Sequence, residues 1–172
     1  FIFVADLYRN SRIRAEQGIS SEALGSINLF LTALEDALLA AQNAVVAAES
    51  MGLGTVYLGS ILADPRPVVK ALELPELTFP IVGLLVGHPD QEPGQNPRMP
   101  LSVMTAQNTY PRVESYSETL ADYDREVTEY YDLRSGSRLE SFTHLVATNI
   151  GVGGAHVSPI MEVLHEQGLC LR

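Results

Sequence analysis

The sequence predicts an α+β protein in which helices flank a small central antiparallel or mixed sheet. Short runs with the composition of buried strands are interspersed among helical segments along its 172 residues. One long Ala-rich segment, 26–51, has apolar residues at helical spacing. Strands and helices do not alternate strictly, as a doubly wound parallel sheet would require. We expect residues 1–172 to form a single domain, since this length buries a sizeable core.

The first elements are a strand and the long helix. Residues 1–6 (Phe-Ile-Phe-Val-Ala-Asp) are typical of a buried strand, and residues 8–26 predict a loop or a weak helix. A strand at residue 1 leads us to expect that an N-terminal part of the fold precedes it. The segment 26–51, with Ser26 as a candidate N-cap, is apolar or small on nearly all faces, which indicates a buried helix. Its alanines permit close helix–helix contact, so it is a candidate for the centre of the fold or of a dimer interface.

Two strands and a helix follow. Residues 55–58 and 79–87 are predicted strands, and Pro80 is compatible with the second only near its start. Between them, Asp64-Pro65 predicts a helix to about Leu72, with Asp as the cap and Pro in the first turn.

The second half is predicted to be mainly helical. Residues 88–100 hold four prolines and one glycine, which predicts an exposed irregular loop. The remaining predicted elements are an extended segment at 101–104, an amphipathic helix at 115–132, a loop at 133–138, a helix at about 139–148, a loop at 149–155 and a last helix at 158–167 stopped by Gly168.

The net charge argues against two kinds of partner. A net charge of −10 disfavours nucleic acid and anionic membrane surfaces, because both require a basic face. We expect no stretch that is long and apolar enough to span a bilayer, because the best candidate, 29–48, contains Glu35, Asp36, Gln42 and Asn43. We therefore expect a cytoplasmic protein.

Cysteine and histidine usage is sparse. Cys170 is the single cysteine, so no intramolecular disulfide is possible, which fits a reducing compartment. The four histidines show no metal-ligand spacing, and we predict no metal site.

The segment 49–61 (Glu-Ser-Met-Gly-Leu-Gly-Thr-Val-Tyr-Leu-Gly-Ser-Ile) is the most informative one. Two glycines end the long helix, and a short β-rich run ends in Gly59-Ser60. Such a pattern can bring bare backbone against a flat ligand, because glycine has no Cβ. The alternative is an ordinary glycine stop at a helix C-terminus.

Three arginines are candidate anion ligands. Arg98 lies in Asn-Pro-Arg-Met-Pro at 96–100, where prolines stiffen the loop, and its guanidinium can bind a phosphate bidentately. Arg134 and Arg138 lie in a predicted loop, where a mobile pair could clasp a phosphate. For all three the alternative is a solvated surface charge.

These segments resemble the FMN-dependent nitroreductase family. The nearest match is its NADPH-preferring branch, which includes the oxygen-insensitive nitroreductases and flavin reductase P. Residues 36–60 are similar to the family's long central helix and flavin-facing turn, and the family-like segments also include 79–89, 97–101 and 164–168.

The resemblance implies an intertwined homodimer with FMN at the subunit interface. It implies a ping-pong reaction in which NADPH reduces the flavin and a nitro compound, quinone or free flavin then takes the electrons. By the same resemblance Tyr57, Leu58, Gly59 and Ser60 would line the flavin. Arg98 would bind the FMN phosphate, and Arg134 would bind NADPH. The choice of acceptor would be set by residues 105–115 and 134–156.

The chain departs from the family pattern at three places. The family's His-Arg-Ser-x-Arg segment, which grips the flavin, would lie before residue 1. Asn96 stands where a lysine is usual, and Val157 stands where the branch often has an arginine, so NADH remains an alternative donor.

Two other functions stay open from the sequence. One is a non-catalytic flavin-binding or dimerisation protein that kept the fold core. The other is an unrelated acidic helical binding module.

Overall fold

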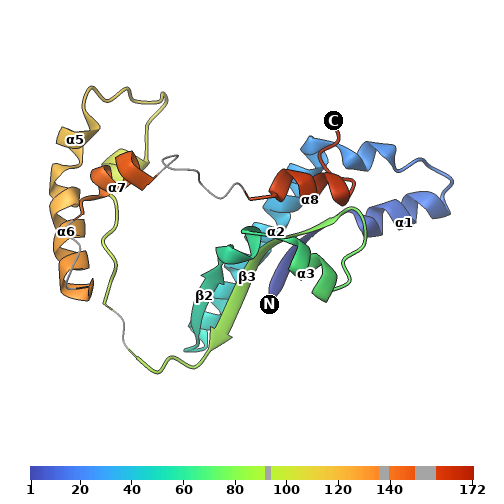
Figure 1. The fold of residues 1–172 in the computed structure, drawn as a ribbon, viewed down its shortest axis with the longest axis horizontal. Helices are drawn as coiled ribbons and strands as arrows, with labels where there is room; N and C mark the ends of the chain where they lie inside the picture. The colour runs from blue at the N-terminus through green and yellow to red at the C-terminus, as the bar shows by residue number, and fades with distance from the viewer. Residues whose placement is uncertain (92–93, 136–139, 150–157) are drawn as a thin grey trace. The chain divides into compact units, whose positions relative to one another are not determined.

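The chain forms two compact units in a computed structural model that describes residues 1–91, 94–135, 140–149 and 158–172. Unit 1 comprises Phe1–Gln91 and Val157–Arg172, and unit 2 comprises Glu92–His156. Figure 1 traces both units, and each is described here by itself. That the whole chain forms a single domain stays a prediction.

Unit 1 is built on a three-stranded antiparallel sheet with the order β1-β3-β2 (Figure 1). The strands are β1 (Ile2–Asp6), β2 (Gly54–Leu58) and β3 (Thr78–Gly87), as the sequence predicts. Pro80 lies near the start of β3, before the pairing with β2 begins at Gly83. The register with β1 shifts between Phe3 and Val4, next to this proline. A residue without an N–H is tolerated at such a bulge.

Unit 1 also contains helices and 3-10 turns. They are α1 (Tyr8–Glu16), η1 (Glu22–Gly25), α2 (Ile27–Ser50), η2 (Gly59–Leu62), α3 (Arg66–Ala71) and α8 (Ile160–Glu166). Pro65, and not Asp64 as predicted, occupies the N-cap position of α3. Asp64 lies one residue earlier, and its Oδ1 accepts from the Arg66 N–H at 3.1 Å. Ser26 occupies the N-cap position of α2 without a side-chain cap bond. The Ile27 N–H instead donates to the Arg172 carbonyl at 2.9 Å.

The core lies between the sheet and the helices, and the C-terminal residues complete it. Its buried side chains are Ala5, Leu7, Phe30, Ala37, Phe79, Ile81, Val163, Leu164 and Leu169. The buried Gln167 amide donates to the carbonyls of Pro75 and Thr78, at 2.9 and 3.0 Å. Buried amides need such partners, so Gln167 fixes the end of α8 beside the start of β3.

The long helix α2 is central, as predicted, but only one of its faces is buried within this chain. Phe30, Ala37, Ala41, Val45 and Ala48 pack inward. The large apolar side chains left exposed along the helix are Ile27, Leu31, Leu38, Leu39 and Val46. The sequence indicated that nearly all faces of α2 are buried. Composition alone does not show whether another part of the protein covers a given face of a helix.

By length and composition alone, α2 is also long and apolar enough to cross a membrane. The expectation of no such stretch was therefore wrong, although Glu35 and Asp36 lie within it. Packing of its inner face against β1 and β3 is what a core helix shows.

Unit 2 consists of α4 (Leu101–Met104), α5 (Tyr116–Thr119), α6 (Ala121–Ser135) and α7 (Phe142–Asn149). Residues 101–104 form a helical turn rather than the predicted extended segment, because the Met104 and Thr105 N–H groups bond back to Pro100 and Leu101. The helix predicted at 115–132 is divided at the buried Leu120.

The loop predicted at 133–138 is helical as far as Ser135, and Arg138 lies outside the described residues. The helix predicted at about 139–148 is α7, and the loop predicted at 149–155 lies mostly outside the described part.

Candidate functional site

The strand end at Tyr57–Ser60 presents open backbone. Its strand, β2, begins at Gly54, shortly after α2 ends at Ser50. The stop is a Schellman motif: Gly52 has φ +76°, and its N–H and that of Leu53 bond to the Glu49 and Ala48 carbonyls at 3.0 and 3.1 Å. The predicted alternative of an ordinary glycine stop therefore describes Gly52.

Gly59 is different. Its φ lies outside the left-handed region, and a Cβ built on it meets no atom within 4 Å. Neither backbone conformation nor packing inside the chain requires glycine here, so the open side of this residue is available to a ligand.

The side chains on either side of Gly59 are partly exposed and held in place. The Tyr57 hydroxyl donates to Gln42 Oε1 on α2 at 3.3 Å, and 42% of Tyr57 is exposed. Leu58 packs over Gly83, where an added Cβ would lie 3.0 Å from the Leu58 Cβ. Ser60 is exposed in η2. The four predicted residues thus offer an aromatic surface, an apolar side chain, bare backbone and a hydroxyl in sequence.

Arg98 lies in unit 2, at a hollow of about 260 Å³ between the 96–98 segment and helices α6 and α7. Its lining residues are Asn96, Pro97, Arg98, Tyr123, Val127, Tyr130, Phe142 and Leu145. The Tyr130 hydroxyl hydrogen-bonds to Asn96 Oδ1. Arg98 is exposed, and among the described residues no carboxylate forms an ion pair with it.

The walls of this hollow are fixed by contacts between α6 and α7. The Tyr123 and Phe142 rings pack edge to face, with centroids 5.4 Å apart. The Asp124 carboxylate accepts from the Thr143 N–H at 2.9 Å and from its hydroxyl at 2.5 Å. Asp124 thereby satisfies a backbone donor in the first turn of α7, where such groups lack helical partners.

Arg134 lies in the last turn of α6, so the predicted loop position is wrong. The helix runs further because the residues from Ala121 to Ser135 contain neither Gly nor Pro. Tyr57–Ser60 belong to unit 1, whereas Arg98 and Arg134 belong to unit 2.

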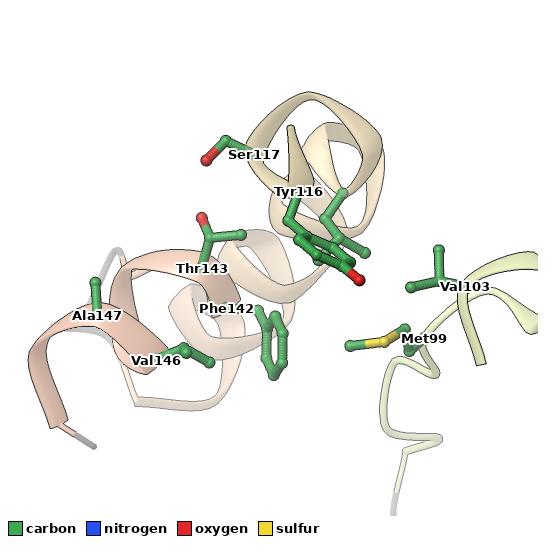
Figure 2. Close-up of a pocket in the computed structure, with 9 residues that line it drawn as sticks. Met99, Val103, Tyr116, Ser117, Phe142, Thr143, Val146 and Ala147 are labelled. Atoms are coloured by element: carbon green, nitrogen blue, oxygen red, sulfur yellow. The ribbon is translucent and has the colours of Figure 1, made fainter. Parts of the chain in front are cut away.

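A second hollow of unit 2 was not foreseen from the sequence. It has a volume of about 440 Å³ and no charged side chain among its lining residues, which are Met99, Val103, Tyr116, Ser117, Leu120, Phe142, Thr143, Val146 and Ala147. Figure 2 shows the Met99 side chain and the Phe142 ring directed toward the same space. The volume falls in the range of small-molecule pockets.

A smaller hollow of about 190 Å³ includes Thr105–Ala106 and Tyr110–Pro111. These residues belong to the segment predicted to influence acceptor choice.

The pKa values of Tyr116, Cys170, Arg66 and Glu166 are shifted. A hydrogen bond with Tyr110 raises the pKa of Tyr116, and burial raises the pKa of the Cys170 thiol. Arg66 bonds to Glu166 at 2.7 Å and to Glu162 at 3.0 Å, which raises its own pKa and lowers the pKa of Glu166. Within the described residues, no group of three or more His, Cys, Asp or Glu could hold a metal ion.

Comparison with known proteins places this α+β arrangement in a family. Residues 21–88 match the model of the nitroreductase family, and residues 96–172 match the model of its C-terminal domain. The chain belongs to the nitroreductase family, which confirms the resemblance seen in the sequence and excludes an unrelated helical module.

Among individual relatives, an FMN reductase (NADPH) of Bacillus subtilis is 39% identical over 142 residues, which are 81% of this chain and 57% of that protein. An NADPH-dependent oxidoreductase of Staphylococcus aureus is 36% identical over all of this chain and 70% of its own length. The solved structure of a Bacillus subtilis nitroreductase matches with a TM-score of 0.88 at 33% identity, covering all of this chain and 70% of that one. The chain thus spans between about half and seven-tenths of the length of these relatives.

Proposed function

We propose that this chain is an FMN-dependent NAD(P)H oxidoreductase that reduces nitro compounds, quinones or flavins by a ping-pong hydride transfer. The observation that carries the proposal is the open backbone at Gly59. Packing within the chain does not require a glycine at this position. Its membership of a family with relatives named FMN reductase (NADPH) and NADPH-dependent oxidoreductase supports the same chemistry.

The described residues fit a flavin. A flavin needs an apolar contact surface, close backbone approach and hydrogen-bond donors near its ring. Tyr57 and Leu58 would supply the apolar contact, Gly59 the approach and Ser60 a hydroxyl. Arg98, without a carboxylate partner among the described residues, would bind the phosphate group. FMN would supply hydride acceptance and donation, whereas these residues would bind and orient it.

Arg134 is proposed to bind NADPH. Its backbone lies in the last turn of α6, which restricts the position of this residue. NADH remains the alternative donor.

We further propose that the functional form is a cytoplasmic homodimer with FMN at the subunit interface. The exposed apolar side chains of α2, among them Leu31, Leu38 and Leu39, support this assembly. Exposed apolar residues that are close along one helix indicate an interaction surface. The net charge of −10 supports a protein without nucleic-acid or anionic membrane partners.

The alternative is a flavin-binding or dimerisation protein without turnover. An anaerobic absorbance titration separates the two: FMN is added, the excess is removed, and NADPH follows. A retained flavin band that bleaches with NADPH and returns when a quinone is added supports the reductase. A retained band that NADPH leaves unchanged supports a flavin-binding protein without turnover. No retained flavin contradicts the reductase and leaves the dimerisation protein as the alternative.

A further inference from the structure

We propose that Tyr130 is a positioning residue for the anion site at Arg98 and that it acts through Asn96. This inference rests on the proposed function, because it concerns how the phosphate of FMN would be bound. It starts from the hydrogen bond between the Tyr130 hydroxyl and Asn96 Oδ1, which ties helix α6 to the segment that carries Arg98.

In the described part of the chain, the other hydrogen bonds that hold the 96–100 segment are those from the Val103 and Met104 N–H groups to the Pro100 carbonyl, at its far end. Pro97 and Pro100 restrict its backbone but have no N–H to donate. Asn96 lies two residues before Arg98 and is exposed, as is Arg98 itself. A long cation on such a segment loses side-chain and backbone freedom when it binds a ligand. A bond that orders the segment beforehand reduces that loss.

The other end of the bond is well supported. Tyr130 is half-buried on α6, one turn after the buried Val127, and both line the hollow at Arg98. The Tyr123–Phe142 ring pair and the Asp124–Thr143 bonds join α6 to α7 beside it. Asn96 is therefore bonded to a fixed wall of the hollow.

The chemistry of Asn96 makes this arrangement consequential. A neutral amide contributes no charge toward a phosphate, so Arg98 is the single cation among the described residues that line the hollow. Affinity for a phosphate would then depend on how well that one guanidinium is oriented. Tyr130 would contribute through orientation alone, without contact to the ligand.

The test compares FMN with riboflavin, which has the same ring system but no phosphate. We expect Tyr130→Phe to weaken FMN binding by about tenfold, the equivalent of one net hydrogen bond, and to leave riboflavin binding unchanged. Tyr123→Phe, which removes a hydroxyl from the same hollow, is the matched control and should change neither. Asn96→Ala should reproduce Tyr130→Phe, and the double variant should be no weaker than either single one, because both remove the same bond.

Equal weakening of FMN and riboflavin, or additive effects in the double variant, would overturn the inference. The proposed function is tested separately by Arg98→Ala, which should weaken FMN by about 10- to 150-fold. If Arg98→Ala leaves the affinity for FMN unchanged, the assignment of Arg98 to the phosphate is wrong, whatever the effect of Tyr130→Phe. If the unaltered chain retains no FMN, amide hydrogen exchange of the ligand-free protein tests the positioning role of Tyr130. We expect faster exchange at Arg98 and Met99 in Tyr130→Phe but not in Tyr123→Phe. Unchanged exchange would overturn the positioning role.

Discussion

Alanine substitutions at Gly59 and Gly83 should have different effects on the free energy of unfolding. Together they test the assignment of the strand end at Tyr57–Ser60 to the flavin. At Gly59 an added Cβ meets nothing within 4 Å. At Gly83, on the neighbouring strand, the same Cβ would lie 3.0 Å from the Leu58 Cβ and 3.4 Å from Ile2 Cδ1. The first methyl group has room inside the chain, whereas the second does not.

The magnitudes follow from this difference. Gly59→Ala should leave the free energy of unfolding unchanged or raise it by up to about 1 kcal/mol, because alanine lowers the entropy of the unfolded chain. Gly83→Ala should lower it by about 1–3 kcal/mol, as for an overpacked core. If a flavin lies against Gly59, the new methyl group should cost a similar amount in binding, or roughly a 5- to 150-fold loss of FMN affinity.

Urea denaturation of the FMN-free proteins measures the first quantity, and fluorescence titration with FMN measures the second. We expect Gly59→Ala to be stable but poor in flavin binding. If Gly59→Ala binds FMN as tightly as the unaltered chain, then no ring approaches this backbone and the assignment of the strand end is refuted. A stable Gly83→Ala would refute the packing argument itself.

The remaining predictions concern the electron donor, acid stability and assembly. Arg134→Ala should raise KM for NADPH without changing bound flavin, and flavin loss in this variant would contradict the assignment. Arg66 lowers the pKa of Glu166 below its ordinary value of 4.5, so the stability from this pair is complete above that pH and is lost as pH falls through the lowered pKa. The stability difference between the unaltered chain and Arg66→Met, followed by thermal unfolding, should therefore vanish in acid, and a difference that persists there would exclude the ion pair as its source. Leu39→Glu, at a position that is 70% exposed on α2, should convert a dimer to a monomer in light scattering, and a dimer that survives would place the interface elsewhere.

The sequence predicted the elements whose signals are local. β1, β2, β3 and α2 were all expected close to their observed bounds, because strand composition and helical spacing depend on neighbouring residues. The helical turn at 101–104 was missed, because four residues are too few to show a helical period. The break at Leu120 was missed for a different reason: the apolar pattern continues across it.

The parts of the candidate site that depend on distant residues could not be foreseen. Tyr57–Ser60 were identified through consecutive residues and a family resemblance. The bond between Tyr130 and Asn96 joins positions 34 residues apart, and no local signal marks it. The absence of the usual lysine at Asn96 was the one feature that could have drawn attention to this position. The exposed half of α2 was likewise invisible, since composition alone does not tell an exposed apolar face from a covered one.

The discontinuous make-up of unit 1 has a consequence for biosynthesis. Its core combines Phe79 and Ile81 with Val163, Leu164 and Leu169, which the ribosome adds only after all of unit 2 has been made. The N-terminal sheet and α2 thus emerge from the exit tunnel before their packing partners exist, with apolar surface uncovered. Chains in this condition are prone to aggregate. Nascent chains of this protein are therefore expected to need a holding chaperone until α8 has been translated.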